Sequence, residues 1–210
     1  MRKVLRRKRA IQLVGCLALL ASACAKQPMR QDPIAADQLD HRLMLNTYIE
    51  EGKLAVLAVN TDATRRRGKS TLIPLGIVIG NNGLPRMTVD RESLTLVDDI
   101  GRRYPLVTVE EVRRLGRQTV TDLEVSRRFA EVFDERLQAM SRVSAVFFPI
   151  QSIGPQRGIV QDRINLPRQH WMIDVVYFPH PEGELLGRKY ELWFSPSELE
   201  DPVFVRFAVE

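Results

Sequence analysis

The chain has 210 residues and carries 31 basic against 26 acidic side chains, which gives a net charge of +5 at pH 7. A chain of this length can form one domain with an ordinary hydrophobic core. Six of the basic residues lie among the first nine, so the rest of the chain is close to neutral and does not indicate a nucleic-acid-binding protein. Only two cysteines are present, which excludes the multiple disulfides on which many small secreted domains depend.

Residues 1–23 have the parts of a secretory signal peptide. A basic stretch is followed by the apolar run 10–23, which is too short to cross a bilayer as a helix. The run ends in Leu20-Ala21-Ser22-Ala23-Cys24, which resembles the lipobox of bacterial lipoproteins. In that family a peptidase cuts just before the cysteine, whose thiol carries a diacylglyceryl group. The resemblance therefore implies cleavage before Cys24 and attachment to the membrane through the lipid on its thiol.

Cys16 is a second candidate for lipidation, because Leu13-Val14-Gly15 before it also fits the lipobox pattern. Cleavage there would leave about half a dozen apolar residues, fewer than the roughly 7 to 15 of a signal peptide. We therefore predict lipidation at Cys24. Ala25 follows it in place of the aspartate that retains many enterobacterial lipoproteins in the inner membrane. The family rule thus implies the periplasmic face of the outer membrane.

Residues 24–40 are interpreted as the lipidated N-terminus and a tether, because they are polar, contain two prolines and lack a regular period. The remaining residues, 41–210, form the single predicted domain. Its first half is rich in β-strand patterns. Apolar runs at 53–59 and 71–79 flank a polar loop, and Asn81-Asn82-Gly83 is typical of a turn.

Two alternating segments come next, at 87–89 and 94–96, with their apolar residues on opposite parities. A β-bulge or bend near residues 90–92 would reconcile them. The tetrapeptide Asp98-Asp99-Ile100-Gly101 then predicts a hairpin turn into a strand at 104–109.

One long helix is predicted at 121–141, after a shorter candidate helix at 110–118. Thr121-Asp-Leu-Glu124 fits a capping box, in which a hydroxyl and a carboxylate each accept a hydrogen bond from a backbone amide of the other residue. An apolar stripe at helical spacing follows and is interpreted as core; it consists of Phe129, Val132, Phe133, Leu137 and Met140.

The chain then returns to strand patterns. Residues 143–150 are apolar on both parities, so this strand needs cover on both faces, and the 121–141 helix is the obvious cover for one of them. Further strands are predicted at 171–178, 190–194 and 203–209. About eight strands with one helical insertion, at about 110–141, predict a mainly β fold, specifically an immunoglobulin-like β-sandwich.

The polar loop before residue 71 carries a relaxed phosphate-binding pattern, Ala63-Thr-Arg-Arg-Arg-Gly-Lys-Ser70. A phosphate-binding loop needs a helix after it, whereas a β-rich segment interrupted by Pro74 follows here. The lipobox also implies a compartment in which nucleoside triphosphates are scarce. We therefore expect no nucleotide ligand.

The same loop is a cluster of positive charge, formed by Arg65, Arg66, Arg67 and Lys69. Two interpretations stay open. In the first, the cluster touches anionic lipid headgroups, where each basic residue near the surface contributes about 1 kcal/mol. In the second, which we favour, it is a solvated loop that keeps a strand edge soluble.

Acid–base and metal chemistry has weak support. No two of the three histidines have metal-ligand spacing, and no cofactor is expected. His180 lies close to Glu182 in a proline-rich loop, which indicates a surface loop more than a metal or acid–base site. Asp174 interrupts an apolar strand, so a buried position would require a partner such as an arginine or raise its pKa. A salt bridge or an edge position is favoured over a functional carboxylate.

The sequence contains no serine-nucleophile motif and no calcium-loop spacing. Three functions are compatible with the remaining patterns. The favoured one is a non-catalytic periplasmic lipoprotein that binds another envelope protein through an edge strand or its helix-bearing face. The second is a binder of a small ligand or envelope polymer at the 179–187 loop. The third is a hydrolase with a site around His180, Glu182 and Asp174.

Overall fold

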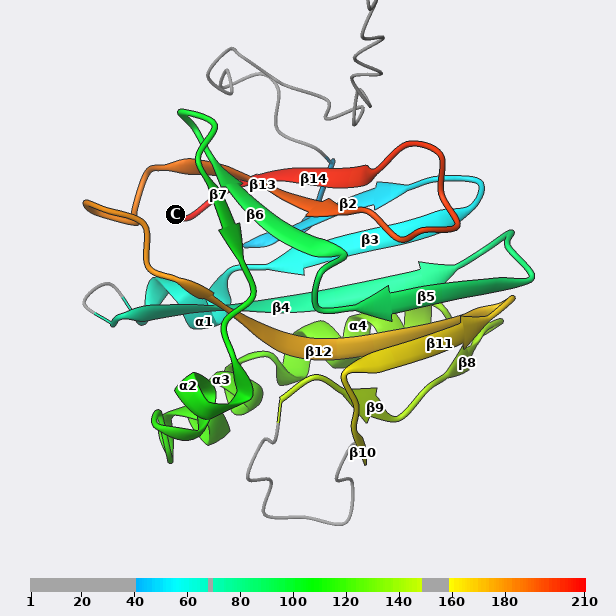
Figure 1. The fold of residues 1–210 in the computed structure, drawn as a ribbon, viewed down its shortest axis with the longest axis horizontal. Helices are drawn as coiled ribbons and strands as arrows, with labels where there is room; N and C mark the ends of the chain where they lie inside the picture. Colours follow the sequence, from blue (N-terminus) through cyan, green and yellow to red (C-terminus); the bar gives the residue numbers. More distant parts are fainter. Residues whose placement is uncertain (1–40, 68–69, 149–158) are drawn as a thin grey trace, which may run out of the picture.

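Strands are the main regular element and form two main sheets, with helices on one side (Figure 1). The computed structural model describes residues 41–67, 70–148 and 159–210. The predicted signal peptide, the lipidation site Cys24, the tether and Lys69 lie outside these residues.

The elements are numbered along the chain in Figure 1. The first strands are β1 (His41–Met44), β2 (Thr47–Glu51), β3 (Ala55–Asn60), β4 (Leu72–Asn81), β5 (Arg86–Asp90), β6 (Leu94–Asp98) and β7 (Arg103–Pro105). The later strands are β8 (Ser141–Arg142), β9 (Ala145–Val146), β10 (Ile159–Val160), β11 (Arg163–Pro167), β12 (His170–Pro179), β13 (Lys189–Phe194) and β14 (Val203–Ala208). The helices are α1 (Asp62–Arg65), α2 (Val109–Arg113), α3 (Gln118–Val125) and α4 (Arg127–Arg136).

The larger sheet is built around one long strand pair. Its strand order is β1-β2-β3-β4-β12-β8, and β4 pairs with β12 in an antiparallel ladder that runs without a register shift from Leu72 opposite Pro179 to Asn81 opposite His170. All ten residues of β4 are buried. Because successive side chains of a strand point to opposite faces, a fully buried strand needs cover on both sides of the sheet.

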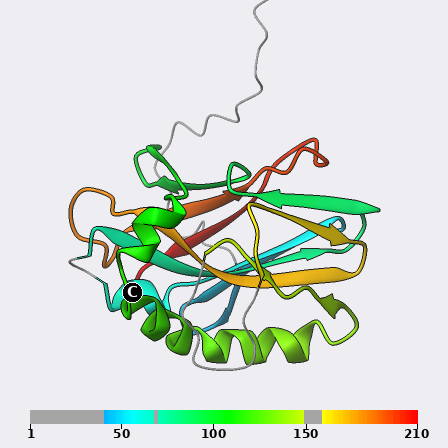
Figure 2. The same cartoon turned by 60° about the horizontal axis from the view of Figure 1, so that its bottom comes forward.

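Helix α4 covers one face of this sheet (Figure 2). Its predicted apolar stripe is confirmed, since Phe129, Phe133 and Leu137 are buried against side chains of the sheet. A glycine of β4, Gly76, leaves space for the Phe129 ring. A Cβ atom at Gly76 would lie 3.2 Å from the Phe129 ring, so the helix sits against the bare backbone of β4.

The second sheet covers the other face. Its strand order is β14-β13-β6-β7, and every pairing in it is antiparallel. Alternate residues of β13 and β14 enter the main core between the sheets; they include Tyr190, Leu192, Phe194, Val205 and Phe207. The prediction of a mainly β fold is confirmed, with two open sheets, and its immunoglobulin-like form stays a prediction.

The helical insertion differs from the predicted one. Instead of one helix at 121–141 there are two, α3 and α4, which break at Ser126. Thr121 therefore lies inside α3, and the predicted capping box at Thr121–Glu124 is wrong. The capping box forms at the start of α2, where the Thr108 hydroxyl accepts from the Glu111 amide and the Glu111 carboxylate accepts from the Thr108 amide. Among the described residues, no helix is long and apolar enough to cross a membrane.

The strand predicted at 143–150 is also different. Only Ala145–Val146 of that range is a strand, and residues 149–150 lie outside the described part of the chain. Its apolar residues are nevertheless core, because Phe147 and Phe148 are fully buried. The bend predicted near residues 90–92 is present, since β5 pairs with β11 whereas β6 joins the second sheet. The hairpin turn at 98–101 is confirmed between β6 and β7.

Candidate functional site

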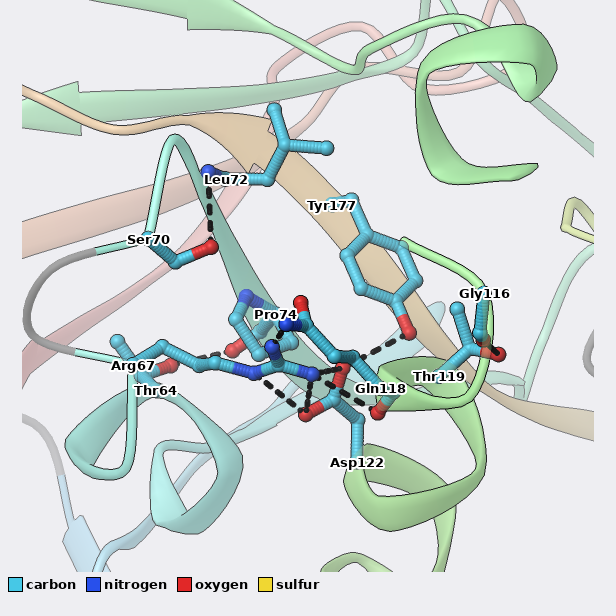
Figure 3. Close-up of polar contacts among 10 residues, drawn as sticks. All are labelled: Thr64, Arg67, Ser70, Leu72, Pro74, Gly116, Gln118, Thr119, Asp122 and Tyr177. Atoms are coloured by element: carbon cyan, nitrogen blue, oxygen red, sulfur yellow. Dashed lines mark hydrogen bonds and ion pairs between the residues drawn. The ribbon is translucent and has the colours of Figure 1, made fainter. Parts of the chain in front are cut away.

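The three described arginines of the basic cluster, Arg65, Arg66 and Arg67, do not share one exposed surface. Arg65 and Arg66 are exposed, whereas Arg67 turns inward and meets Asp122 of α3 (Figure 3). The Arg67 Nε and Nη2 atoms donate to the Asp122 carboxylate over 3.0 and 2.8 Å, and Nη2 also donates to the Gln118 carbonyl over 2.8 Å. The Arg67 and Asp122 side chains are only 12% and 3% exposed. Arg67 is therefore unsuited to contact lipid headgroups.

Tyr177 of β12 completes this polar network. Its hydroxyl donates to Asp122 Oδ2 over 3.2 Å, so one carboxylate joins the loop after α1, helix α3 and the central strand (Figure 3). Burial raises the pKa of Asp122, and the hydrogen bonds and charge of Arg67 oppose that rise. Burial also raises the pKa of Tyr177, in the same direction as the nearby Asp122 charge. This network connects helix α3 with strand β12. The Asp122 carboxylate is taken up by Arg67 and Tyr177, so the network has a structural role.

The three residues of the hydrolase hypothesis do not come together. Asp174 and His180 are six positions apart on and just beyond an extended strand, which at about 3.3 Å per residue is roughly 20 Å. Glu182 points to a different partner, Arg102, and their ion pair of 3.0 Å is exposed on both sides. Among the described residues, no group of three or more histidine, cysteine, aspartate or glutamate side chains could hold a metal ion.

Asp174 binds the backbone of a neighbouring segment. It is 4% exposed, and its carboxylate accepts from the Phe147 amide over 2.7 Å and from the Val175 amide over 2.8 Å. The segment before Phe147 already runs along the edge of β12, where the Val143 amide donates to the Trp171 carbonyl over 2.8 Å. The backbone pairing between β8 and β12 stops at Trp171. Beyond it the Asp174 carboxylate, in place of a backbone carbonyl, accepts the hydrogen bond of the Phe147 amide.

Arg91 provides the positive charge near Asp174. Its guanidinium lies 4.5 Å from the centre of the Phe148 ring, and it donates to the Phe147 carbonyl. Burial raises the pKa of Asp174 to about 7, and the two amides and the Arg91 charge oppose that rise. The sequence-based expectation that a buried Asp174 needs a partner or a raised pKa is thus met on both counts.

Hydrogen bonds and an ion pair of Arg188 connect the 179–187 loop with the rest of the structure. Arg188 donates to Asp99 over 2.6 Å and to the Glu182 carbonyl over 2.7 Å, which links this loop to the β6–β7 hairpin. The His180 ring contacts the Pro181 carbonyl through Nδ1, and its buried Nε2 atom has no hydrogen-bond partner among the described atoms.

The outer side of the second sheet carries a stacked aromatic pair that the sequence patterns do not predict. We call it the aromatic face and define it by Arg103, Trp193, Phe204 and Arg206. Trp193 is only 6% exposed, Phe204 and Arg206 are half-buried, and Arg103 is exposed. The pairing of β13 with β14 sets Trp193 opposite Phe204, and their rings stack with centres 5.2 Å apart and planes 19° apart. Arg103 lies over the Trp193 ring at 5.4 Å and Arg206 over the Phe204 ring at 4.7 Å.

A buried carboxylate holds the aromatic face in place. Glu191 is 1% exposed, accepts from Trp193 Nε1 over 2.8 Å and forms an ion pair of 3.0 Å with Arg206 Nε. Alternation along β13 and β14 places these side chains on the outward parity. The sequence shows that alternation, but it does not show which residue of β14 lies opposite Trp193, and the surface depends on that register.

A cavity of about 260 Å³ lies beside the aromatic face. It is lined by the end of β2 and by β14 and the residue before it, through Glu50, Gly52, Pro202, Val203, Phe204 and Arg206. Pockets that bury drug-sized ligands usually have about 300 to 1,000 Å³. This cavity is thus below the usual size for such ligands.

No family model matches the chain, and no curated protein matches it. Among solved structures, the chain is similar to the crystal structure of "a putative lipoprotein (ycdA)" from Bacillus subtilis subsp. subtilis str. 168, with a TM-score of 0.40 and 12% sequence identity. The alignment covers 76% of this chain and 38% of that chain. The similarity therefore concerns less than half of the Bacillus chain and shows no shared family.

The buried ion pair predicts a stability effect at Arg67. Replacing it in Arg67→Met leaves the Asp122 carboxylate buried without its cation and is expected to lower the free energy of unfolding by about 3 kcal/mol. Urea unfolding of the full chain measures this change. The matched control, Arg65→Met, removes an exposed cation from the same loop and is expected to stay within about 0.5 kcal/mol. Equal stability of the two variants, with equal loss of binding to anionic vesicles, would instead support the headgroup interpretation.

Asp174 predicts a pH dependence of stability. The pKa of Asp174 is about 7 in the folded protein against the ordinary aspartate value of 3.8, so between these values the folded protein holds a proton that the unfolded chain releases. The free energy of unfolding should therefore fall as pH rises toward 7, with a slope of up to about 1.4 kcal/mol per pH unit from this group. Asp174→Asn cannot titrate and should remove this component. Urea unfolding across this range checks it, and identical slopes for the two proteins would contradict the assignment.

Proposed function

We propose that the protein is a lipid-anchored protein of the bacterial cell envelope, held on the periplasmic face of the outer membrane. The support is the signal peptide pattern and the lipobox ending at Cys24. A tether of seventeen residues, 24–40, reaches at most about 60 Å when extended, so the domain stays close to its membrane. The partner is therefore sought among other proteins of the envelope.

In this proposal the domain is a non-catalytic module that binds another envelope protein through its aromatic face. The observation that carries the proposal is the stacked pair Trp193 and Phe204 with arginines over both rings. Trp193 is 6% exposed and supports the stack from below, so Phe204, Arg103 and Arg206 are the members that a partner can contact. Tryptophan and arginine are enriched among the residues that contribute most to protein–protein binding. Because Glu191 already fixes the Trp193 ring and Arg206, these groups lose little conformational entropy on binding.

The charges of this face indicate the chemistry of the partner. Alternation places Arg103, Lys189, Glu191 and Arg206 on the outward parity of β7, β13 and β14, and three of these four are cations. The single carboxylate is buried beneath the face, in its ion pair with Arg206. An acidic surface on the partner complements this arrangement and would speed the encounter.

The non-catalytic part of the proposal is supported by the separation of the candidate hydrolytic residues. The Asp174 carboxylate accepts from the Phe147 amide, whereas Glu182, in the loop after β12, pairs with Arg102 of the β6–β7 hairpin. Acid–base catalysis requires its groups within hydrogen-bond reach of one substrate.

Reversing one charge of the aromatic face tests the proposal. Arg103 is exposed and no carboxylate among the described residues pairs with it, so Arg103→Glu is expected to leave the melting temperature nearly unchanged. We expect this variant to fail to complement a strain that lacks the gene, because like charges then oppose the acidic partner. The measurement is growth under envelope stress together with thermal unfolding of the purified protein.

Two further variants in the same assay serve as controls. Arg66→Glu reverses an exposed charge away from the aromatic face and should complement fully. Cys24→Ala should yield a folded protein that is not anchored and does not complement. Full complementation by Arg103→Glu would count against the aromatic face, whereas full complementation by Cys24→Ala would remove the need for the anchor.

A further inference from the structure

Three turns at one end of the molecule each hold a large aliphatic side chain in solvent. Leu45, Ile100 and Leu186 are 65%, 61% and 57% exposed, more than any other large hydrophobic side chain among the described residues. They lie in the β1–β2 turn, the β6–β7 hairpin and the 179–187 loop. Glycine, proline, asparagine, aspartate and serine dominate turn positions, and exposed apolar residues are usually scattered singly. The grouping of these three therefore indicates a contact surface.

Two ion pairs join the loop after β12 to the β6–β7 hairpin (Figure 1). The Arg188 guanidinium donates to the Asp99 carboxylate over 2.6 Å. Arg102 of the hairpin forms a second ion pair of 3.0 Å with Glu182 of the loop. The tips of the loop and the hairpin therefore lie side by side.

The third turn lies at the same end of the molecule. The Gly187 amide donates to the Val209 carbonyl over 2.7 Å, which brings the residues after β14 to the loop. The Phe207 ring, two residues earlier, lies against Tyr48, with ring centres 6.3 Å apart. Tyr48 is the second residue of β2, directly after the turn that carries Leu45. The three turns are thus at the left of Figure 1.

Hydrogen bonds fix the shape of the two neighbouring tips. In the hairpin, the Ile100 amide donates to the Asp98 carboxylate over 3.1 Å. In the loop, the Arg188 amide donates to the Leu185 carbonyl over 3.2 Å, which closes a turn with Leu186 at its second position. Because these turns are already ordered, their exposed side chains lose little conformational entropy when another surface covers them.

The opposite end of the molecule has a more acidic surface. Its loop between β13 and β14 carries exposed acidic side chains at Glu198, Glu200 and Asp201. The end with the three turns carries exposed charges of both signs, among them Arg65, Arg66, Arg102, Glu182, Glu184 and Glu210. Mixed charge beside apolar tips suits a zwitterionic lipid surface, because its headgroups also carry both signs.

The chain enters the domain near the end with the three turns. In the proposed function, the tether of residues 24–40 leads from the lipidated Cys24 to His41, the first residue of β1. The four residues of β1 separate that point from Leu45, a distance of about 13 Å. The lipid anchor therefore brings this end of the domain close to the membrane.

We propose that this end of the domain rests on the zwitterionic lipid surface of the membrane that holds Cys24, with the side chains of Ile100 and Leu186 inserted. The inference rests on the lipid anchor of the function proposed above. The two side chains enter the boundary between the headgroups and the acyl chains, where apolar groups are favoured. The backbone of both tips stays at the hydrated level of the headgroups, so amide exchange of the 179–187 loop does not change and side-chain labels report the contact.

The contact orients the domain. β14 runs toward the membrane, and Phe204 lies five residues before Val209, about 17 Å from the end that touches lipid. The aromatic face then points along the membrane plane, toward neighbouring proteins of the envelope.

Fluorescent labels at the two tips test the contact. With Cys24 acylated and Cys16 removed with the signal peptide, an introduced cysteine is the single free thiol of the mature chain. Ile100→Cys and Leu186→Cys each receive an environment-sensitive dye, and the lipidated protein is reconstituted in vesicles of phosphatidylethanolamine and phosphatidylcholine. We expect lipids with a spin label near the headgroup end of the acyl chain to remove most of the dye emission in both variants.

The matched control is Leu54→Cys, with the same dye in the β2–β3 turn. Leu54 is 45% exposed, and its carbonyl accepts from the Asn82 amide, which places it at the end of the larger sheet away from the tips. Its label should keep its emission. Equal quenching of all three labels, or no quenching of the labels at Ile100 and Leu186, would overturn the inference.

A second substitution changes one tip while the dye stays on the other. Leu186→Asp places a charge at the lipid boundary, so the label of Ile100→Cys should lose much of its quenching. Leu54→Asp is the matched change and should leave that quenching as it is. Both leucines are exposed, so thermal unfolding should be nearly unchanged in both variants. Full quenching in the Leu186→Asp protein would count against insertion of the tips.

The same labels detect two other occupants of the tips. A dye shift that grows with protein concentration in the absence of vesicles would assign the tips to a second copy of the chain. A dye that stays in water in the vesicles and becomes covered only in native membranes would assign them to a protein partner. Either result overturns the lipid contact.

The outcomes separate this inference from the proposed function. If the tips are quenched and Arg103→Glu complements fully, the membrane contact holds and the aromatic face fails. If the tips stay in water and Arg103→Glu does not complement, the contact is wrong and the proposed function stands. If mass spectrometry finds no lipid on Cys24, the anchor and the contact fail together.

Discussion

The ladder between β4 and β12 organises both layers of the fold. It consists of ten consecutive pairs and places β4 in the middle of the larger sheet, with every residue of β4 buried. Such a pair is stable only when apolar layers cover both faces. Helix α4 supplies one layer and the inner side of β13 and β14 supplies the other. The aromatic face lies on the other, outward side of the second sheet, where Trp193 and Glu191 are buried under Phe204 and the two arginines.

Three buried carboxylates connect segments that are not joined by the backbone hydrogen bonds of the sheets. Asp122 connects the helices with the sheet, Asp174 captures the segment beside β12, and Glu191 supports the aromatic face. A buried charge is costly unless hydrogen bonds or an opposite charge compensate it. Each of the three has such partners, so their burial argues for fixed geometry at these junctions. The contacts of Glu191 fix the Trp193 ring and the Arg206 guanidinium on the outer side of the second sheet.

Local patterns predicted the parts of the fold that depend on local physics. The apolar stripe from Phe129 to Met140 predicted a helix packed on the core, and the turn at 98–101 predicted a hairpin; both are present. The break at Ser126 was missed because no glycine or proline marks it and the apolar stripe begins only at Phe129, after the break. The capping pattern at Thr121 was a false match, since the same residue types occur inside helix α3.

The candidate site could not be predicted because it depends on pairing between distant residues. Arg67 and Asp122 are 55 positions apart, and nothing in their local sequences links them. Strand alternation indicated that Phe204 and Arg206 share a face, but the position of Trp193 opposite Phe204 follows from the register of two strands. Register is set by the whole core and not by the strand alone. The basic cluster in the sequence did not predict an exposed charged surface for the same reason. Arg67 forms a buried ion pair with Asp122, which is distant in the sequence.

The proposed function assigns the partner-binding surface to β13 and β14. Hydrogen–deuterium exchange of the full chain in its native membranes, compared with the purified protein, measures whether a partner covers these strands. The expected result is slower exchange in membranes in β13 and β14, with no change in the 179–187 loop. Slower exchange confined to that loop or to α4, with β13 and β14 unchanged, would contradict it.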